Sequence, residues 1–398
     1  MLFVNILFIL LASLVSIPIV VVFVEAIAAW FVKENEVLLE GERPSVTVLI
    51  PAHNESAVIT STLKNLKQEL AQEDNVLVIA DNCSDNTADL VREQGYNVVE
   101  RFNDTERGKG FALDHGLTQL EATPPEQIII LDADCLIDRK TVDGLLATVE
   151  KTGRPVQATY LLSLPDNPGP TDYVSAFAFL VKNRVRPQGL HVLRQPCLLT
   201  GTGMAFPWKT IRNAPLASGN IVEDMQLSLD LALEGSPVSF LPNSLVRSVL
   251  PGQREAAVSQ RTRWEHGHLN TLLTQVPRLL RGSIVQRRID LLSLALDLAV
   301  PPLALLVMLW GAVFGVTALI AAFKIAVVPF TIMAITGILL FVAIGISWFR
   351  FGRSTLPKEK LLSIPLYVLW KIPMYVKYIF QRQSAWVRTE RDTPNTVS

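Results

Sequence analysis

The sequence predicts an α/β domain with a largely parallel sheet, flanked by helices that cross a membrane. Short β-branched runs alternate with helical stretches between residues 45 and 132, which is typical of a parallel α/β sheet. The 398 residues are 49% hydrophobic with a mean hydropathy of +0.33. That composition is too apolar for an ordinary soluble enzyme and too polar for a protein that lies wholly in a membrane. The formal net charge of -1 indicates no nucleic-acid partner.

The N-terminal segment is almost wholly apolar, and we expect residues 1–31 to form a transmembrane anchor. A cleaved signal peptide is the alternative, because Ala26-Ile27-Ala28 resembles a cleavage site. No Lys or Arg precedes the apolar run, however, and the run is long for a signal peptide. We therefore favour the uncleaved anchor.

Four apolar runs are the expected strands of the sheet, at residues 45–50, 76–80, 97–100 and 128–131. Between them we expect helices at about residues 55–71, from about 85 and from about 109. Asn54, Asp81 and Asp132 lie at or just after the ends of three of these strands. In parallel α/β sheets ligands bind at the carboxyl ends of the strands. The sequence therefore predicts a ligand site at this edge.

The last of these strands ends in two carboxylates, Asp132 and Asp134, separated by one residue. Such a pair is suited to hold a divalent cation against the phosphates of a nucleotide, and oxygen ligands favour Mg²⁺ or Mn²⁺. A solvated turn is the alternative interpretation. The cysteines have no close metal-ligand spacing, and we expect reduced, buried thiols at Cys83, Cys135 and Cys197.

Residues 153–251 have a less regular pattern. Within them we expect a loop at residues 165–170, a flexible turn at residues 201–204, and helices at residues 173–185 and 225–234. After them we expect a further helix at residues 256–275, with Pro277 just beyond it. In that last helix Gln260, Arg263 and Trp264 follow an i, i+3, i+4 spacing and therefore share one face.

The C-terminal part contains two long apolar stretches flanked by basic residues, and we expect two transmembrane helices within residues 289–350. By the positive-inside rule both basic clusters are cytoplasmic, which keeps the α/β domain in the cytosol. Residues 361–381 are apolar but include Lys371 and Lys377. We predict an interfacial amphipathic helix there, with a fourth span as the alternative, and a cytosolic tail at residues 382–398.

Six motifs together resemble membrane-anchored family 2 glycosyltransferases with the GT-A fold, a Rossmann-like nucleotide-sugar-binding domain. The resemblance is to the cellulose, chitin and hyaluronan synthase side of that family. In order, the motifs are Ile50–Glu55, Ala80–Thr87, Gly108–Gly110, Asp132–Asp134, Glu223–Asp224 and the Q-x-x-R-W run Gln260–Trp264. The resemblance implies a GT-A domain at residues 44–285. Two positions depart from the family pattern: Ala80 replaces a common aspartate, and Val222 replaces the usual threonine.

The resemblance also implies roles at the donor site. Asp134 is the expected direct metal ligand, and Asp132 is expected to bind either the metal or the ribose and sugar. Lys109 and Arg263 would contact the diphosphate, although each can also be a solvated or surface-paired cation. Asp81 would accept a hydrogen bond from uracil, which favours UDP over GDP. Asn54 and Glu55 would line the opening of the same donor site.

At the acceptor side the resemblance makes Asp224 the general base and Glu223 an orienting residue. The alternative is that both acids complement a helix dipole. The acceptor would contact Gly203, Gln260 and Trp264, although a lone tryptophan is more often part of a core. We interpret His266 and His268 as satisfied or interfacial histidines rather than metal ligands.

These features predict an inverting, metal-dependent glycosyltransferase of the cytoplasmic membrane that uses a UDP-sugar. Its expected acceptor is a membrane lipid or a lipid-linked saccharide of surface polysaccharide biosynthesis. A small processive β-glycan synthase is the enzymatic alternative, because the resemblance is to polymer synthases. The polymer synthases carry more membrane helices and a gating segment that we do not find here. An alternative of another class is a catalytically silent nucleotide-sugar sensor or assembly subunit.

Overall fold

The computed structural model describes residues 2–33, 37–217 and 222–380. The chain divides into two compact units. The sheet unit comprises Lys33–Asn167 and Pro196–Gly267, and the helical unit comprises Met1–Val32, Pro168–Gln195 and His268–Arg382. The predicted tail at residues 382–398 lies outside the described residues.

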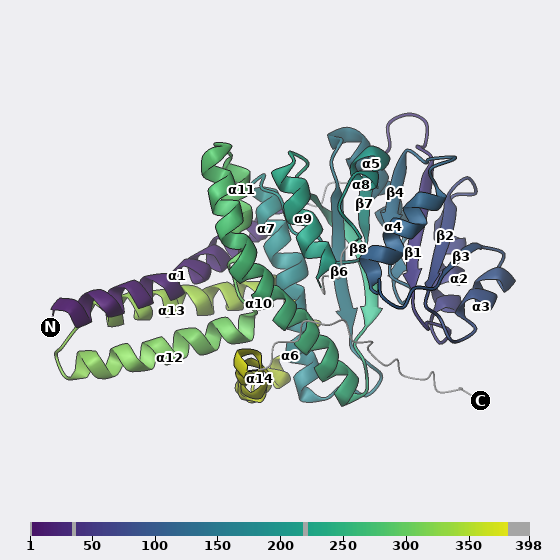
Figure 1. Ribbon diagram of the computed structural model, residues 1–398. Helices are drawn as coiled ribbons and strands as arrows, with labels where there is room; N and C mark the ends of the chain where they lie inside the picture. The colour runs from purple at the N-terminus through teal and green to yellow at the C-terminus, as the bar shows by residue number, and fades with distance from the viewer. Residues whose placement is uncertain (1, 34–36, 218–221, 381–398) are drawn as a thin grey trace. The chain divides into compact units, whose positions relative to one another are not determined.

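The described strands of the sheet unit form a mixed sheet in the order β3-β2-β1-β4-β7-β6-β8-β5 (Figure 1). Its parallel half consists of β1 (Val46–Ala52), β2 (Asn75–Asp81), β3 (Asn97–Arg101) and β4 (Gln127–Ile130). Most of their side chains are buried, as expected for strands that are covered on both faces. The α/β fold class is therefore confirmed.

Three helices connect the parallel strands: α2 (Ile59–Glu69), α3 (Thr87–Glu93) and α4 (Lys109–Gln119). A further helix, α5 (Arg139–Thr152), comes after β4. Helix α4 packs against β1 and β2, and a Cβ at its Gly116 would come within 2.8 Å of Ile79. The carboxylate of Asp138 caps α5 by accepting a hydrogen bond from the Thr141 N–H at 2.7 Å. Local capping and close helix–sheet packing together fix the position of the loops at the strand ends.

The sequence pattern did not predict the other half of the sheet, which contains β5 (Leu136–Ile137), β6 (Val156–Ser163), β7 (Met204–Pro207) and β8 (Ser239–Val249). Strand β7 runs antiparallel to both β4 and β6. Helices α8 (Trp208–Arg212) and α9 (Glu223–Leu233) follow β7. The sequence does not indicate β7 because this strand is short, and it does not indicate β8 because β8 has no regular alternation of buried and exposed residues.

Helix α10 (Arg254–Val285) is longer than predicted, because it continues through Pro277 instead of ending before it. An internal proline removes one backbone hydrogen bond but does not always end a helix. The residues of α10 up to Gly267 belong to the sheet unit, and those from His268 belong to the helical unit. Its N-terminal turns therefore carry the Q-x-x-R-W run within the sheet unit.

In the described part of the helical unit, three helices are long and apolar enough to cross a membrane: Asn5–Trp30, Leu303–Ala322 and Val328–Gly352. They correspond to α1 (Leu2–Trp30), α12 (Leu303–Ala322), and α13 (Val328–Ser347) with a following π-helical turn, η2 (Trp348–Gly352). All three pack side by side (Figure 1). The apolar region that we expected to be one span before Phe323 is divided, since Pro301 and Pro302 separate a short helix, α11 (Ile289–Leu298), from α12.

Residues 168–195, inside the predicted domain of residues 44–285, belong to the helical unit. They form α6 (Pro170–Leu180), a π-helical turn, η1 (Val181–Val185), and α7 (Arg186–Val192). Helix α7 packs closely on α1, and a Cβ at Gly189 would lie 2.1 Å from the Glu25 carbonyl oxygen. The buried guanidinium of Arg186 forms ion pairs with Glu25 and Asp297. The last described helix is α14 (Ser363–Phe380), which packs against α6 and α12.

Candidate functional site

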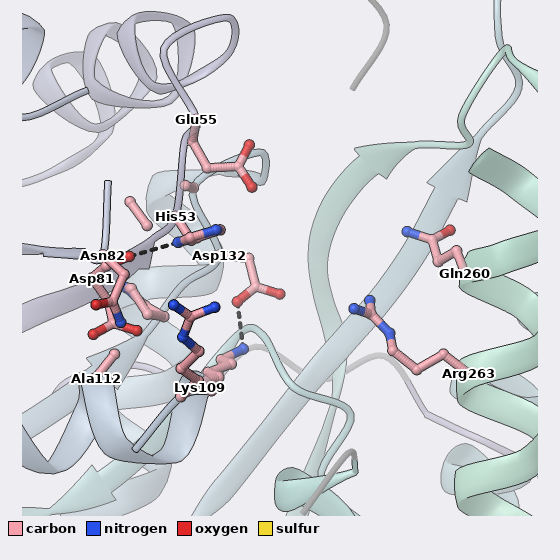
Figure 2. A pocket seen from close by; sticks show the side chains of 14 residues that line it. His53, Glu55, Asp81, Asn82, Lys109, Ala112, Asp132, Gln260 and Arg263 are labelled. Atoms are coloured by element: carbon pink, nitrogen blue, oxygen red, sulfur yellow. Dashed lines mark hydrogen bonds and ion pairs between the residues drawn. The ribbon is translucent and has the colours of Figure 1, made fainter. Parts of the chain in front are cut away.

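A pocket in the sheet unit lies at the carboxyl ends of β1, β2 and β4 (Figure 2). Of the residues that the sequence singled out, the pocket is lined by Glu55, Asp81, Lys109, Asp132, Gln260 and Arg263. Figure 2 shows Gln260 and Arg263 projecting from α10 toward the side where Lys109 and Asp132 lie. Segments more than 200 residues apart in the chain therefore meet in one pocket.

Lys109, the first residue of α4, lies at the centre of a group of carboxylates. Its Nζ donates hydrogen bonds to Asp132 Oδ1 and, at 2.6 Å, to the Gly201 carbonyl oxygen. Burial alone would lower the pKa of Lys109, but Asp132 and Glu223 outweigh it and raise that pKa above its ordinary value. The ammonium group is therefore permanently charged and held in place.

The carboxylates of Asp132 and Asp134 can hold a metal ion together with the Cys135 thiol, since one ligand atom of each lies within 4.8 Å of the others. Ser248 Oγ donates a hydrogen bond to Asp134 Oδ2 at 2.9 Å. Burial and Asp134 raise the pKa of the Cys135 thiol well above its ordinary value, and a protonated thiol is a poor ligand. The two carboxylates are thus the better ligands, and they suit a hard divalent cation. The spacing of the three cysteines does not indicate Cys135 as a neighbour of the metal-binding carboxylates.

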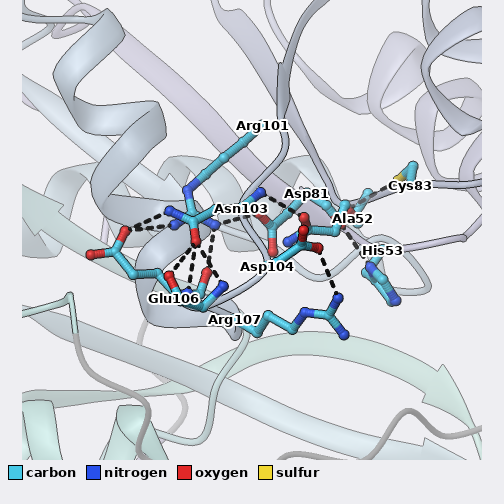
Figure 3. Close-up of polar contacts among 11 residues, drawn as sticks. Ala52, His53, Asp81, Cys83, Arg101, Asn103, Asp104, Glu106 and Arg107 are labelled. Atoms are coloured by element: carbon cyan, nitrogen blue, oxygen red, sulfur yellow. Dashed lines mark hydrogen bonds and ion pairs between the residues drawn. The ribbon is translucent and has the colours of Figure 1, made fainter.

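Asp81, at the end of β2, is buried and forms an ion pair with Arg101 at 2.8 Å (Figure 3). Arg101 Nη1 also donates to the Glu106 carbonyl oxygen at 2.8 Å, and its guanidinium lies over the Phe111 ring. The carboxylate that was predicted to read the base therefore already has a cationic partner, which holds it at the edge of the pocket. The sequence pattern gave no sign of Arg101.

Asn54 has a structural position beside the pocket. It adopts a left-handed backbone conformation, and its Oδ1 accepts hydrogen bonds from the N–H groups of Ser84 and Asp85 at 2.6 and 3.2 Å. It thereby ties the loop after β1 to the loop after β2. The neighbouring His53 lines the pocket, and its Nδ1 lies 2.7 Å from the Asp81 carbonyl oxygen. His53 was not singled out, although it stands in the same motif.

The two acids of the Glu-Asp motif occupy the first turn of α9. Asp224 Oδ1 accepts a hydrogen bond from the Met225 N–H at 2.7 Å. Burial and the adjacent Asp224 raise the pKa of Glu223 to about 7. Both acids therefore also lie at the positive end of the α9 helix dipole.

Gly201 and Gly203 face different surroundings. A Cβ on Gly201 would lie 3.3 Å from Asp224 Oδ2, whereas a Cβ on Gly203 would lie 2.6 Å from the Val246 side chain. Both residues have positive φ angles, +92° and +64°, which favour glycine. Gly203 therefore packs against β8, and Gly201 is the glycine beside the catalytic acid of our prediction.

The Q-x-x-R-W residues also differ from one another. Gln260 is buried and lines the pocket, and its Oε1 has no hydrogen-bond partner in the described part of the chain. Trp264 is half-buried and is not among the described residues that line the pocket. His268 is buried with Nε2 3.2 Å from the Leu298 carbonyl oxygen, as a satisfied histidine would be.

A mixed α/β sheet with a pocket at the carboxyl ends of its parallel strands is the arrangement of the GT-A fold. Residues 44–267 match the family model described as glycosyltransferase like family 2, and the chain belongs to that family. The predicted family resemblance and the predicted enzyme class are thereby confirmed. Since the family catalyses glycosyl transfer, the protein is a glycosyltransferase.

Curated relatives include poly-beta-1,6-N-acetyl-D-glucosamine synthases. That of Staphylococcus epidermidis is 24% identical over 267 residues, which cover 63% of this chain and 62% of that protein. One from Staphylococcus aureus is 23% identical and covers 58% of this chain and 56% of that protein. The matches thus span about three fifths of the length of these relatives. The mannosyltransferase PcManGT from Pyrobaculum calidifontis, solved with GDP-Man and Mn²⁺, has a TM-score of 0.57 at 17% identity. Its match covers 95% of this chain and 99% of that chain, so the two share a fold.

Proposed function

We propose that this glycosyltransferase moves a sugar from a UDP-sugar to a membrane-associated acceptor, with inversion at the anomeric carbon. The observation that carries the proposal is the pocket in which Lys109, Asp132 and Arg263 converge. Two cations and a metal-binding carboxylate are what a nucleotide diphosphate requires as it leaves. Gln260 lines the same pocket beside Arg263.

The donor proposed is a UDP-sugar, with N-acetylglucosamine as the first sugar to test. Asp81 accepts the N3–H of uracil in this proposal, and Arg101 holds its carboxylate in place through their ion pair. The choice of sugar rests on the relatives named as poly-beta-1,6-N-acetyl-D-glucosamine synthases.

The proposed cofactor is Mg²⁺ or Mn²⁺, held by Asp134 and by Asp132. When bound, such an ion neutralises charge that develops on the leaving diphosphate. Lys109 adds a second positive charge and fixes Asp132. Ser248 keeps Asp134 oriented by its hydrogen bond.

Asp224 is the proposed general base, which takes the proton of the attacking acceptor hydroxyl. Its Oδ2 lies beside Gly201, where the lack of a side chain leaves room for an acceptor. Glu223 is the proposed orienting acid, with Lys109 as its cationic neighbour. A single base that promotes direct displacement gives inversion.

The acceptor and the membrane orientation are also part of the proposal. In this proposal the three candidate spans anchor the chain, and the basic residues after α13 support a cytosolic sheet unit by the positive-inside rule. Helix α14 buries Tyr367, Lys371 and Met374 on one face and exposes an apolar stripe on another, which favours an interfacial position. The exposed stripe includes Leu366, Leu369, Ile372, Val376 and Ile379. We propose a lipid or a lipid-linked saccharide as acceptor.

A processive β-glycan synthase is the second candidate, and the names of the curated relatives favour it. Product length separates the two functions. Single transfer gives one added sugar per acceptor, whereas a ladder of oligomers would establish the polymerase.

The test is release of UDP from a panel of UDP-sugars by the full chain in lipid nanodiscs, with Mg²⁺ or Mn²⁺ and a membrane lipid extract. We expect turnover with one donor, abolished by a chelator and by Asp224→Asn. Asp230→Asn, the same change nearly two turns further along α9, is the control and keeps its activity. Binding of UDP without turnover of any donor would contradict the proposal and support the silent sensor or subunit.

A further inference from the structure

We propose that Gln157 is a positioning residue for the transfer reaction. It holds the segment Thr200–Gly203, here the 200–203 loop, against the residues that bind the donor. The inference rests on the proposed function for its catalytic consequence, but the clamp itself can be tested without turnover. Neither the family motifs nor the sequence pattern singled out Gln157.

The amide group of Gln157 is fully engaged by backbone. The side chain is 1% exposed, and its Oε1 accepts a hydrogen bond from the Thr200 N–H at 2.8 Å. Its Nε2 donates to the Thr202 carbonyl oxygen at 2.9 Å and to the Ala158 carbonyl oxygen at 2.7 Å. One planar amide therefore holds the 200–203 loop at two points, Thr200 and Thr202.

The held loop in turn contacts two residues of the proposed site and lies beside a third. The Gly201 carbonyl oxygen accepts from Lys109 Nζ at 2.6 Å, and Thr202 Oγ1 accepts from the Asp132 N–H at 3.0 Å. A Cβ on Gly201 would lie 3.3 Å from Asp224 Oδ2. The loop therefore holds Lys109 and Asp132 by hydrogen bonds and lies beside Asp224, the proposed base.

Backbone geometry explains why a glutamine is needed. Positive φ angles at Gly201 and Gly203 turn the 200–203 loop out of a regular ladder, so the Thr200 N–H and the Thr202 carbonyl oxygen need a side-chain partner. Gln157 lies opposite Met204 at the start of β7, and the register of β6 shifts directly afterwards, between Ala158 and Tyr160. Such irregularities re-aim side chains next to active sites. Glutamine supplies both the acceptor and the donors that the loop lacks.

The catalytic consequence follows from the precision that the reaction requires. A displacement of about 1 Å in a positioned group can cost on the order of 100-fold in rate. Without the amide, the loop can move and carry the hydrogen-bond partners of Lys109 and Asp132 with it. We therefore expect the loss mainly in kcat.

The experiment compares Gln157→Met with a matched control, Gln127→Met. Gln127 is also a buried glutamine of the sheet, at 4% exposure, but its Nε2 donates to the Leu146 carbonyl oxygen of α5 at 3.2 Å. Both variants lose one buried amide. Hydrogen–deuterium exchange of the full chain in nanodiscs, kcat and KM for the donor, and the melting temperature are measured for each.

We expect faster exchange at the amides of the 200–203 loop and a 10- to 100-fold lower kcat in Gln157→Met only. Unchanged exchange in that loop would overturn the clamp. Faster exchange with kcat within threefold of wild type would overturn the positioning role, as would an equal loss of kcat in Gln127→Met. If the wild type turns over no donor, the proposed function fails, and the exchange data still decide the clamp.

If Gln157→Met does not fold, a second pair of variants tests the role of the 200–203 loop. Thr202→Val keeps the shape of this fully buried side chain but removes the acceptor for the Asp132 N–H, whereas Thr202→Ser retains it. We expect a lower kcat in Thr202→Val with rescue in Thr202→Ser. Equal activity of the two would contradict the proposed route through Asp132.

Discussion

Lys109 and Asp132 form an ion pair that joins the first residue of α4 to the loop after β4. The same ammonium group donates to the Gly201 carbonyl oxygen, so three separate segments converge on one charge. A half-buried cation among carboxylates is stable only where its partners are well aligned. This arrangement presents a fixed positive charge to the pocket, beside the carboxylates proposed to hold the metal.

Removal of the Lys109 charge should destabilise the transition state of the transfer reaction more than it destabilises the folded protein. We expect Lys109→Met to lower kcat/KM for the donor on the order of 100-fold, because a fixed charge next to the leaving diphosphate is lost. Steady-state kinetics of UDP release measure the effect. Lys67→Met, a change at an exposed lysine of α2, is the control and should leave kcat/KM unchanged. A loss of less than about threefold in Lys109→Met would contradict the assignment.

The metal assignment predicts graded effects at Asp134 and its partner. Asp134→Asn should raise the Mn²⁺ concentration for half-maximal activity most strongly, because a carboxylate ligand is lost. Ser248→Ala removes only the hydrogen bond to Asp134 Oδ2 and should weaken Mn²⁺ binding about 10-fold. Direct Mn²⁺ titration by electron paramagnetic resonance checks both. Equal Mn²⁺ affinity in wild type and Asp134→Asn would remove Asp134 from the metal site.

Strands β1, β2 and β4 could be predicted because each is a mostly apolar run followed closely by polar residues. Strands of this kind are buried on both faces and leave a clear local pattern. Strands β5 and β7 have two and four residues, and β8 mixes buried and half-buried positions, so no such pattern exists there. Their positions are determined by pairing with distant strands, which a local pattern does not record.

The candidate site divides in the same way. Asp81, Lys109 and Asp132 were predictable because each directly follows a strand or begins a helix. The partners that fix them were not: Arg101 lies 20 residues from Asp81, and Gly201 lies 92 residues from Lys109. The family resemblance indicates Gly203 as the acceptor-side glycine, and only the fold shows that a Cβ on Gly203 would meet Val246, whereas one on Gly201 would meet Asp224.

The Asp81–Arg101 pair makes a prediction about stability. Arg101→Leu leaves a buried carboxylate without its cation and should lower the free energy of unfolding by about 3–5 kcal/mol. Thermal and chemical unfolding measure the change. Arg92→Leu, which breaks an exposed pair with Glu100, is the control and should leave the melting temperature nearly unchanged.

A double variant separates the structural role of this pair from base recognition. Replacing both residues, Asp81→Leu with Arg101→Leu, should recover much of the stability, since no unpaired charge stays buried. The double variant should nevertheless fail to bind UDP, because it lacks the carboxylate proposed to accept a hydrogen bond from uracil. Full recovery of UDP affinity in the double variant would exclude Asp81 from base recognition.

Glu223 makes a prediction about pH, because burial and Asp224 raise its pKa from 4.5 to about 7. Between these two values the folded protein binds more protons than the unfolded chain, so this group stabilises the fold below about pH 4.5 and loses that contribution as pH rises through about 7. The contribution is about 1–3 kcal/mol. Melting temperatures from pH 5 to pH 8 should therefore fall more steeply for wild type than for Glu223→Gln, which cannot ionise. Glu234→Gln, at the exposed end of α9, should keep the wild-type slope, whereas equal slopes for wild type and Glu223→Gln would show that Glu223 ionises without cost.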